Sequence, residues 1–364
     1  MHGLALRASW LTRFKQRMSR GRYQPVVLVL SLVTFATSCD RAQRSPNGKA
    51  GQNSFRTVTI SNLDPRRDVA GRIIDAHDGC LQFFDGRFYL YGTAYGNSDG
   101  YSVTNRYRVY SSPDLEQWTF EGEMLKGQPE GVYYRPYVVF NAQTRKYVLW
   151  YNWYPVLWHG QVGVAISDTP IGPFTIVNTN VLRHREGSRS GDGSLFVDDD
   201  GKGYFVFSAI EDGYAIRVLS LTADYLGLTG EASNILAKGG EAPLMFRRDN
   251  LYYVLCGPLC AACPSGSQVQ VLTATSPFGP FTPRANINRR PDNGAPLIPA
   301  QETWVAKIPG SDGSVFIWLA DRWQSTPDGI KGHDFQFWAP LEFSPEGDIL
   351  PLKAVTRWYI ARTQ

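Results

Sequence analysis

Apolar and aromatic residues recur along the chain in short runs, and Gly, Asp, Asn and Pro separate the runs. Five runs stand out by their aromatic content, and the chain usually enters them through a tight turn. They cover residues 83–94, 140–153, 197–209, 247–258 and 310–322. Short runs between turn signals, without a helical period, predict β-strands.

The five runs are spaced at similar intervals of 58, 57, 48 and 64 residues, measured between Tyr89, Tyr147, Tyr204, Tyr252 and Phe316. A strand-rich unit of this length that repeats along a chain is typical of a propeller blade with about four strands. Because one blade cannot bury its faces alone, the units should fold together. The sequence therefore predicts an all-β fold, a five-bladed β-propeller over residues 59–362.

A polar residue lies 11 to 15 positions upstream of each reference aromatic; the set is Asp78, Arg135, Asp192, Glu241 and the pair Gln301–Glu302. The innermost strand of every blade lines a central channel, so residues at one phase of the repeat should converge on the propeller axis. Three carboxylates, an arginine and an amide would meet there. This pattern predicts a central active-site channel.

Glycine, proline and aromatic residues are abundant, with 35 Gly, 23 Pro, 19 Phe, 19 Tyr and 10 Trp, as expected for a large β protein. Aromatic rings also suit sugar binding, because the apolar C–H face of a sugar can stack on a ring. Most single aromatics should be packing residues. We expect Trp158, Trp304 and Trp323, near the ends of the repeated units, to form walls of sugar subsites.

Residues 1–38 have the pattern of an export signal: six basic residues and no acidic one in 1–22, an almost wholly apolar run over 25–36, and small residues before Cys39. The run is shorter than the roughly 20 residues that span a bilayer. Cys39 resembles the acylated cysteine of a bacterial lipobox. An ordinary signal peptide or a type II membrane anchor are the alternatives. We expect an exported protein, lipid-anchored in the cell envelope through Cys39 or secreted.

Residues 39–58 are polar and aperiodic, which predicts a flexible tether. The net charge of the chain is +4, and removal of the six basic residues of the signal leaves about −2. The basic balance therefore belongs to the signal, and nucleic-acid binding is not supported. We expect a monomer.

Four further cysteines are Cys80, Cys256, Cys260 and Cys263. The last two form a C-x-x-C motif, but a zinc knuckle would need a second pair and a redox motif would need a βαβ context. In an oxidising compartment we expect a Cys260–Cys263 disulfide that closes a loop. The other two cysteines are either buried thiols or a second bridge.

Three motifs resemble the signatures of glycoside hydrolase family 43, in the same order and at the same spacing to the following strand. They are Asp78-Gly-Cys-Leu before DGRFYLYGT, Asp192-Gly-Ser-Leu-Phe before DDDGKGYFVF, and Glu241-Ala-Pro before NLYYVLCG. The resemblance implies a five-bladed propeller that hydrolyses arabinan, xylan, arabinoxylan or galactan with inversion. It implies Asp78 as general base, Asp192 as the carboxylate that tunes the acid, and Glu241 as general acid.

Arg135, Gln301 and the segment 320–323, with Arg322 and Trp323, resemble substrate-contacting positions of the galactan-active branch. The chain departs from the family in having Asp-Gly where many members have Asp-Pro, and Ala-Pro where many have Gly-Pro. In part of the galactan-active branch a glutamine positions the water in place of the aspartate. This chain has both Asp78 and Gln301, so the sugar and the water-positioning group stay open.

Inverting hydrolysis of a glycosidic bond requires two carboxyl groups about 6.5–9.5 Å apart. One is protonated at the leaving oxygen, and the other is ionised beside the attacking water. A neighbouring negative charge raises the pKa of a carboxyl, and Asp192 precedes Glu241 by one unit of the repeat.

Two other classes of protein compete with an inverting hydrolase. A non-catalytic glycan-binding propeller would be expected to lose the carboxylates. A sugar-transferring relative would be a fructosyltransferase, whose carboxylates lie about 5 Å apart, or a phosphorylase, which needs a basic phosphate pocket. Arg135 and Arg322 are present, but the sequence shows no basic cluster. We expect no required cofactor and no catalytic metal, although His333 could support a central calcium ion as in several family members.

Overall fold

The computed structural model describes residues 55–183, 189–260, 263–311 and 313–363. The predicted signal over residues 1–38, Cys39 and most of the predicted tether lie outside the described residues. Within the described part of the chain, no helix is long and apolar enough to cross a membrane.

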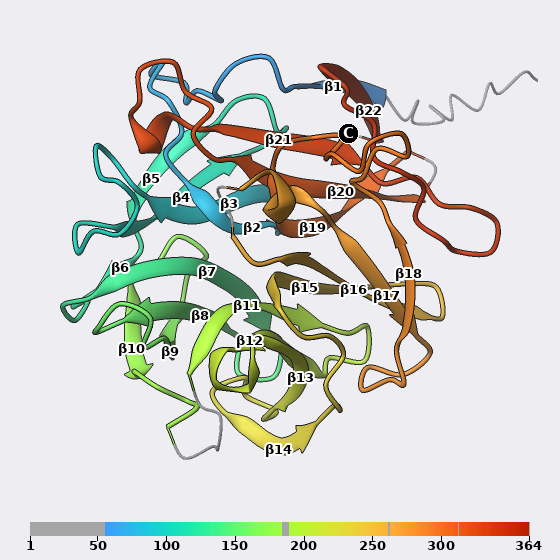
Figure 1. Cartoon of the computed structure of the whole chain (residues 1–364). Coiled ribbons are helices and arrows are strands. Elements are labelled where there is room, and N and C mark those ends of the chain that lie inside the picture. The colour runs from blue at the N-terminus through green and yellow to red at the C-terminus, as the bar shows by residue number, and fades with distance from the viewer. Residues whose placement is uncertain (1–54, 184–188, 261–262, 312, 364) are drawn as a thin grey trace, which may run out of the picture. The chain divides into compact units, whose positions relative to one another are not determined.

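Five sheets follow one another along the chain, and each is one blade of a propeller (Figure 1). Blade 1 contains β2 (His77–Phe84), β3 (Arg87–Ala94), β4 (Arg106–Ser112) and β5 (Thr119–Glu123). Blade 2 contains β7 (Val132–Asn141), β8 (Lys146–Tyr154), β9 (Gln161–Ser167) and β10 (Phe174–Asn178), with β6 (Leu125–Lys126) parallel to β10. Blade 3 contains β11 (Ser190–Val197), β12 (Gly203–Ala209), β13 (Ala215–Leu221) and β14 (Leu228–Ala232).

Blade 4 contains β15 (Gly240–Arg248), β16 (Leu251–Pro258), β17 (Gln270–Ala274) and β18 (Thr282–Asn286). Blade 5 contains β19 (Gln301–Gly310), β20 (Gly313–Arg322) and β21 (Phe335–Pro340). The helices described are three short 3-10 turns, η1 (Ile210–Asp212), η2 (Pro264–Ser267) and η3 (Lys331–His333). The first strands contact one another in a closed cycle, β2–β7–β11–β15–β19–β2, so they surround the axis. The predicted five-bladed β-propeller is confirmed.

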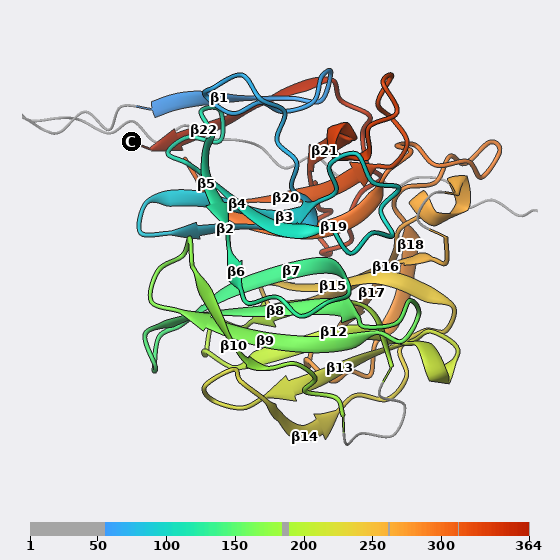
Figure 2. The ribbon, with the colours of Figure 1, turned by 90° about the vertical axis from the view of Figure 1, so that its left-hand side faces the viewer.

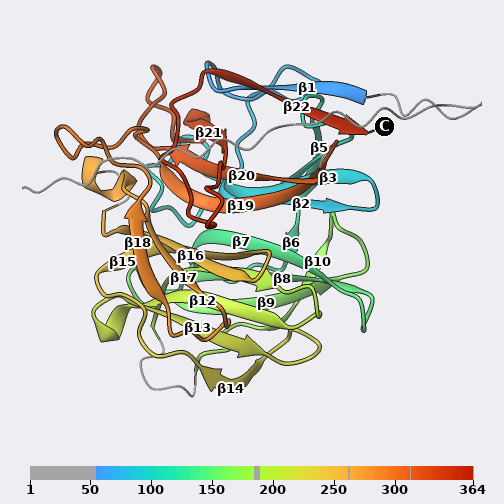
Figure 3. The ribbon, with the colours of Figure 1, turned by 90° about the vertical axis from the view of Figure 1, so that its right-hand side faces the viewer.

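Blade 5 has three strands, and a separate ribbon lies beside it. This ribbon pairs β1 (Phe55–Ser61) with β22 (Arg357–Thr363) in antiparallel register. Figures 2 and 3 show it outside blades 1 and 5. Asn62 joins it to β21, because its side chain donates to the carbonyl of Trp338 (2.8 Å) and accepts from the same residue's N–H (2.9 Å). The described fold thus includes a strand that starts at Phe55, four residues before the predicted boundary at 59.

Aromatic side chains fill the spaces between blades. Trp150 of blade 2 packs on Phe205 of blade 3 with ring centroids 5.1 Å apart, and Trp118 packs edge-on against Trp338 of blade 5 at 6.1 Å. These three tryptophans are at most 2% exposed. The aromatic-rich second strand of each blade, which marked the repeat in the sequence, therefore supplies much of the core.

Every innermost strand carries a one-residue β-bulge at the same place. In β2 the pairing with β3 passes from His77↔Thr93 to Cys80↔Tyr91, so β2 has one residue more than its partner. The same shift occurs within residues 134–137 of β7, 190–193 of β11, 241–244 of β15 and 302–304 of β19. A bulge re-aims side chains and is common beside active sites. The repeated polar residues lie at or next to these five bulges.

Candidate active site

The bulge of β2 places Asp78 in a buried position, with 3% of the residue exposed. Its backbone has φ +49°, which a non-glycine residue rarely adopts and which is often retained for function. Its carboxylate accepts hydrogen bonds from the hydroxyl groups of Thr93 (2.7 Å) and Tyr95 (2.5 Å) and from the N–H of Arg135 (3.2 Å). Burial raises the pKa of Asp78 to about 6, against the opposing effects of Arg135 and the two hydroxyls.

Asp321 holds the backbone at this bulge from the other end of the chain. Its carboxylate accepts from the N–H of Asp78 (2.6 Å) and lies 3.1 Å from Nδ1 of His77, while Nε2 of His77 lies 3.3 Å from the carbonyl of Gly332. Burial lowers the pKa of His77, but the charges of Asp321 and Asp75 outweigh it and raise that pKa to about 9. His77 and Asp321 therefore form a buried imidazolium–carboxylate pair next to Asp78. Its only sequence signal was the resemblance of segment 320–323.

Arg135 and Asp192 form an ion pair that links blades 2 and 3. Nε of Arg135 lies 2.9 Å from Oδ1 of Asp192, and Arg135 is almost fully buried. The other carboxylate oxygen of Asp192 accepts from the N–H of Ala242 at 2.8 Å, directly after Glu241. Ala242 has φ +53°, in the left-handed region. Asp192 is thereby fixed beside Glu241, in the position that a charge tuning the acid would need.

The carboxyl group of Glu241 accepts a hydrogen bond from the amide of Gln301 (2.8 Å). Burial, followed by the negative charge of Asp192, raises the pKa of Glu241 to about 7. The opposing positive charge of Arg135 does not cancel these two effects. Glu241 can therefore carry a proton near neutral pH, which a general acid requires.

Gln301 connects the acid to the rest of the site. Its side-chain oxygen accepts from NH2 of Arg135 (3.3 Å) and from Nε1 of Trp323 (3.0 Å), while its amide nitrogen donates to Glu241. An amide oxygen has two lone pairs, so both are already engaged. Gln301 is thus built to orient Glu241, Arg135 and Trp323.

A series of aromatic rings runs outward from the carboxylates. The ring centroids of Trp323 and Tyr95 are 5.9 Å apart. Further ring contacts lead from Tyr95 through Tyr134 and Tyr154 to Trp158. Trp158 is 55% exposed and has φ +67°, which is unusual for so bulky a residue. Tyr101, 56% exposed, lies beside it with ring centroids 5.9 Å apart. The structure therefore places Trp323 at the carboxylates and Trp158 at the outer end of the same aromatic series.

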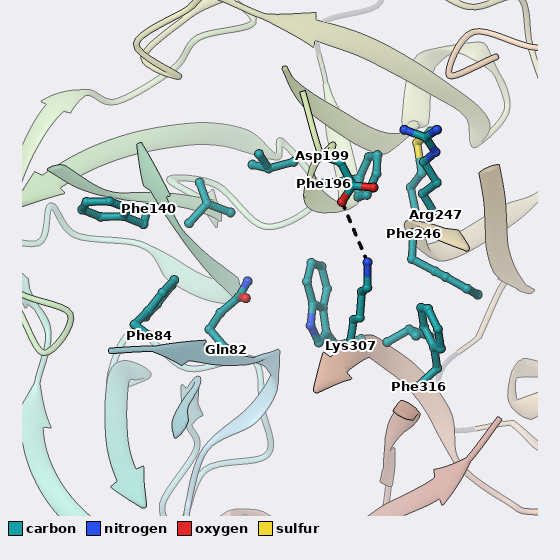
Figure 4. Close-up of a pocket in the computed structure, with 14 residues that line it drawn as sticks. Gln82, Phe84, Phe140, Phe196, Asp199, Phe246, Arg247, Lys307 and Phe316 are labelled. Carbon is teal, nitrogen blue, oxygen red and sulfur yellow. Dashed lines mark ion pairs between the residues drawn. The ribbon is translucent and has the colours of Figure 1, made fainter. Parts of the chain in front are cut away.

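The structure does not bring Trp304 to this site. Trp304 is 7% exposed, packs on Tyr137 at 5.4 Å and lines a cavity of about 250 Å³ toward the other ends of the innermost strands. Figure 4 shows this cavity, with five phenylalanines around it and an ion pair between Lys307 and Asp199 (3.8 Å). The bulge between Glu302 and Trp304 changes which side chains of β19 face the axis at each end.

Arg322 also lies apart from the carboxylates. Its guanidinium is 5.8 Å from the ring centroid of Phe335, and none of the contacts described for it involves Asp78, Asp192 or Glu241. Side chains alternate along a strand, so Arg322 points away from the face on which its neighbour Asp321 contacts Asp78.

His333 does not form a metal site in the described structure. Its Nδ1 lies 2.7 Å from a carboxylate oxygen of Asp328 in an exposed loop. Among the described residues there is no group of three or more His, Cys, Asp or Glu that could hold a metal ion. The described side chains therefore offer no such group of ligands to the calcium ion that the resemblance suggested.

Glu302, next to Gln301, is fully buried. Neither of its carboxyl oxygens has a hydrogen-bond partner among the described residues. Burial raises its pKa well above the usual value, which favours the protonated form of this side chain. Of the two adjacent residues, only Gln301 has its side chain in the hydrogen-bond network of the site. The side chain of Glu302 lies outside that network.

Two of the four described cysteines lie in a loop and the other two in the core. The sulfur atoms of Cys260 and Cys263 form a disulfide with Cα atoms 5.3 Å apart, whereas Cys80 and Cys256 are buried free thiols. The disulfide closes the loop that follows β16 in blade 4, the blade that carries Glu241.

A five-bladed propeller that gathers Asp78, Asp192 and Glu241 at its axis, with raised pKa values for Asp78 and Glu241 and with Asp192 fixed beside Glu241, has the fold and site expected of a propeller glycosidase. Residues 73–293 match the model of the family "Glycosyl hydrolases family 43". The chain belongs to this family, and it spans about half of the length of the first curated relatives that it matches.

Relatives in this family act on different sugars. The chain is 27% identical over 300 residues to an arabinoxylan arabinofuranohydrolase of Bacillus subtilis, covering 66% of this chain and 56% of that enzyme. It is 26% identical over 335 residues to a β-D-galactofuranosidase of Aspergillus niger, covering 86% and 92% of the two chains. An exo-β-1,3-galactanase from Clostridium thermocellum superposes with a TM-score of 0.71 at 26% identity, covering 83% of this chain and 68% of that one.

Proposed function

We propose that the protein hydrolyses glycosidic bonds with inversion, using Glu241 as general acid and Asp78 as general base. The observation that carries this proposal is the contrast between two buried carboxyls on non-adjacent blades. Asp78 is held by three donors that favour its ionised form, whereas Glu241 is buried beside the charge of Asp192, which favours its protonated form.

In this mechanism Glu241 gives its proton to the glycosidic oxygen as the bond from that oxygen to the anomeric carbon breaks. A water molecule attacks the anomeric carbon from the opposite face and gives a proton to Asp78. The products are a sugar of inverted configuration and the released alcohol. Asp78 then returns its proton to solvent and Glu241 regains one, so the balance of protons is closed.

The hydrogen bonds favour Asp78 over Gln301 as the group that positions water. The two lone pairs of the Gln301 oxygen already accept from Arg135 and Trp323. A carboxylate offers about four acceptor positions, and Asp78 uses three of them. One position therefore remains for the attacking water.

We further propose a neutral, galactose-containing glycan such as β-1,3-galactan as the substrate, with Trp323 at the cleaved sugar and Trp158 beside a more distant one. The galactanase and galactofuranosidase relatives support galactose. The arabinofuranohydrolase relative keeps arabinoxylan as the alternative substrate. The exposed rings of Trp158 and Tyr101 would offer a stacking surface to a polymer.

A screen of β-1,3-galactan, arabinan, xylan, arabinoxylan and aryl galactofuranosides tests this function. We expect galactose to be released from β-1,3-galactan, with the α-anomer appearing first by ¹H NMR. First appearance of the β-anomer would indicate a retaining enzyme, as in fructosyltransferases. Binding of a glycan without release of sugar would indicate a non-catalytic propeller.

The two shifted carboxyls predict a narrow pH optimum. The value of kcat/KM should rise as Asp78 ionises through about pH 6 and fall as Glu241 loses its proton through about pH 7. Asp192→Asn removes the negative charge beside Glu241, so the pKa of Glu241 should drop and the alkaline limb should move to lower pH, by on the order of one unit. Asp199→Asn, on an exposed aspartate in the other cavity, is the control. An unchanged alkaline limb in Asp192→Asn would mean that Asp192 does not tune the acid.

We also propose that the protein is exported and held in the cell envelope by a lipid on Cys39, as the pattern of residues 1–39 suggests. In a bacterial host fed labelled palmitate, the label should appear on the wild-type chain and be lost in Cys39→Ser, because acylation needs that thiol. Label that survives the substitution would contradict the lipid anchor.

A further inference from the structure

A lysine that the sequence motifs did not single out lies at the active site. The ammonium of Lys331, at the start of η3, lies 4.0 Å from the ring centroid of Trp323 and 4.9 Å from that of Tyr95. Trp323 donates to Gln301, and the hydroxyl of Tyr95 donates to Asp78. Lys331 therefore contacts two rings of the site. Tyr95 is hydrogen-bonded to Asp78, and Trp323 is hydrogen-bonded to Gln301, the partner of Glu241.

The fold holds Lys331 in this position. Its side chain lies against Gly100, where a Cβ atom would come 2.5 Å from Cε of Lys331. The turn that carries Lys331 is tied to the site by Gly332, whose N–H donates to the carbonyl of Gly96 (2.9 Å) and whose carbonyl lies 3.3 Å from His77.

The ammonium of Lys331 has three hydrogen-bond donors, and none of them has an acceptor within hydrogen-bond distance among the described residues. Its nearest carboxylate oxygen, on Asp334, is 3.9 Å away, and its side chain is only 21% exposed. A donor group that is partly removed from water without an acceptor is costly. This cost is recovered if a ligand supplies the acceptor.

We propose that Lys331 is a substrate-binding residue that donates a hydrogen bond to a hydroxyl group of the sugar at the cleaved bond. This inference rests on the proposed glycosidase function and adds a specificity determinant to it. The charges around the ammonium favour a neutral sugar over a uronic acid, because the carboxylates of Asp334, Asp321, Asp78 and Asp99 act on the same ammonium. A sugar carboxylate would be repelled by them.

The test compares Lys331→Met, which keeps an unbranched side chain only one heavy atom shorter and removes the ammonium, with Lys307→Met in the other cavity. The substrates are the aryl glycoside that the wild type cleaves best and its monodeoxy analogues. A hydrogen bond from a charged donor is worth about 10–100-fold in kcat/KM. We expect Lys331→Met to lose this factor and Lys307→Met to keep wild-type activity.

The decisive result is the coupling between the lysine and one hydroxyl group. For the wild type, one deoxy analogue should be about 10–100-fold poorer than the parent glycoside. For Lys331→Met, that same analogue should be no poorer than the parent glycoside. Equal penalties in both proteins, or activity of Lys331→Met within about twofold of the wild type, would overturn the proposal, since a purely structural role would not depend on one hydroxyl.

Binding separates this inference from the proposed hydrolysis. The fluorescence of Trp323 and its neighbours would be titrated with free galactose in Glu241→Gln, with and without Lys331→Met. Loss of binding with Lys331→Met supports the lysine contact even if no glycan is hydrolysed, in which case only the catalytic proposal fails. Unchanged binding, together with hydrolysis by the wild type, would reject Lys331 and keep the glycosidase.

Discussion

Glu241→Gln should slow hydrolysis of an unactivated glycan about 10²–10⁴-fold, the usual range for the loss of general-acid help. Glutamine keeps the size of the side chain and can still accept from Gln301, but it has no proton to give. An aryl glycoside with a good leaving group should be affected far less, because its departing oxygen hardly needs protonation. The ratio of the two losses, measured as kcat/KM on both substrates, is the readout.

Glu302→Gln is a matched control, since it makes the same change at a second buried carboxyl, whose pKa is also raised by burial and which lies outside the hydrogen-bond network of the site. Its activity on both substrates should remain close to that of the wild type. The decrease of kcat/KM at alkaline pH should be absent in Glu241→Gln and present in Glu302→Gln. Equal losses on the two substrates for Glu241→Gln would assign the acid to another residue.

Asp78→Asn should slow both substrates alike, also by about 10²–10⁴-fold, because attack by water is needed whatever group leaves. The acidic limb of the pH profile, which reports ionisation near pH 6, should vanish with it. Thermal unfolding must be compared, because the introduced asparagine would present an NH₂ group to one of the donors that now bind the carboxylate.

Near-normal activity of Asp78→Asn would transfer the water-positioning role to Gln301. The hydrogen bonds argue against this outcome, since the oxygen of Gln301 is fully engaged. Asp199→Asn, in the cavity at the other ends of the innermost strands, should leave kcat/KM on both substrates unchanged. It should also leave the acidic and alkaline limbs of the pH profile unchanged.

Periodicity and turn chemistry were sufficient to predict the propeller. The aromatic runs and their spacing identified five blades, and the polar residue at one phase of each repeat identified five innermost strands. Asp78, Arg135, Asp192, Glu241 and Gln301 meet in the structure because equivalent positions of a closed ring lie at equal distances from its axis. Repetition encodes this convergence, so no knowledge of contacts was needed.

The direction of individual side chains could not be predicted in the same way. The sequence suggested Trp304 as a subsite wall and Arg322 as a substrate-contacting residue, but one extra residue in β19 and the alternation along β20 turn these side chains elsewhere. Lys331 showed no motif, and it reaches the site because the turn after β20 folds back over Gly96 and Gly100.

The sequence by itself thus determined the repeat, the blade count and the residues that can converge on the axis. Only the tertiary structure decided the pairing of β1 with β22 and the support of Asp78 by Asp321. The physical reason is that a periodic pattern reports which face of a strand is buried. Contacts between residues more than 200 positions apart depend on bulges and loops whose geometry no local pattern encodes.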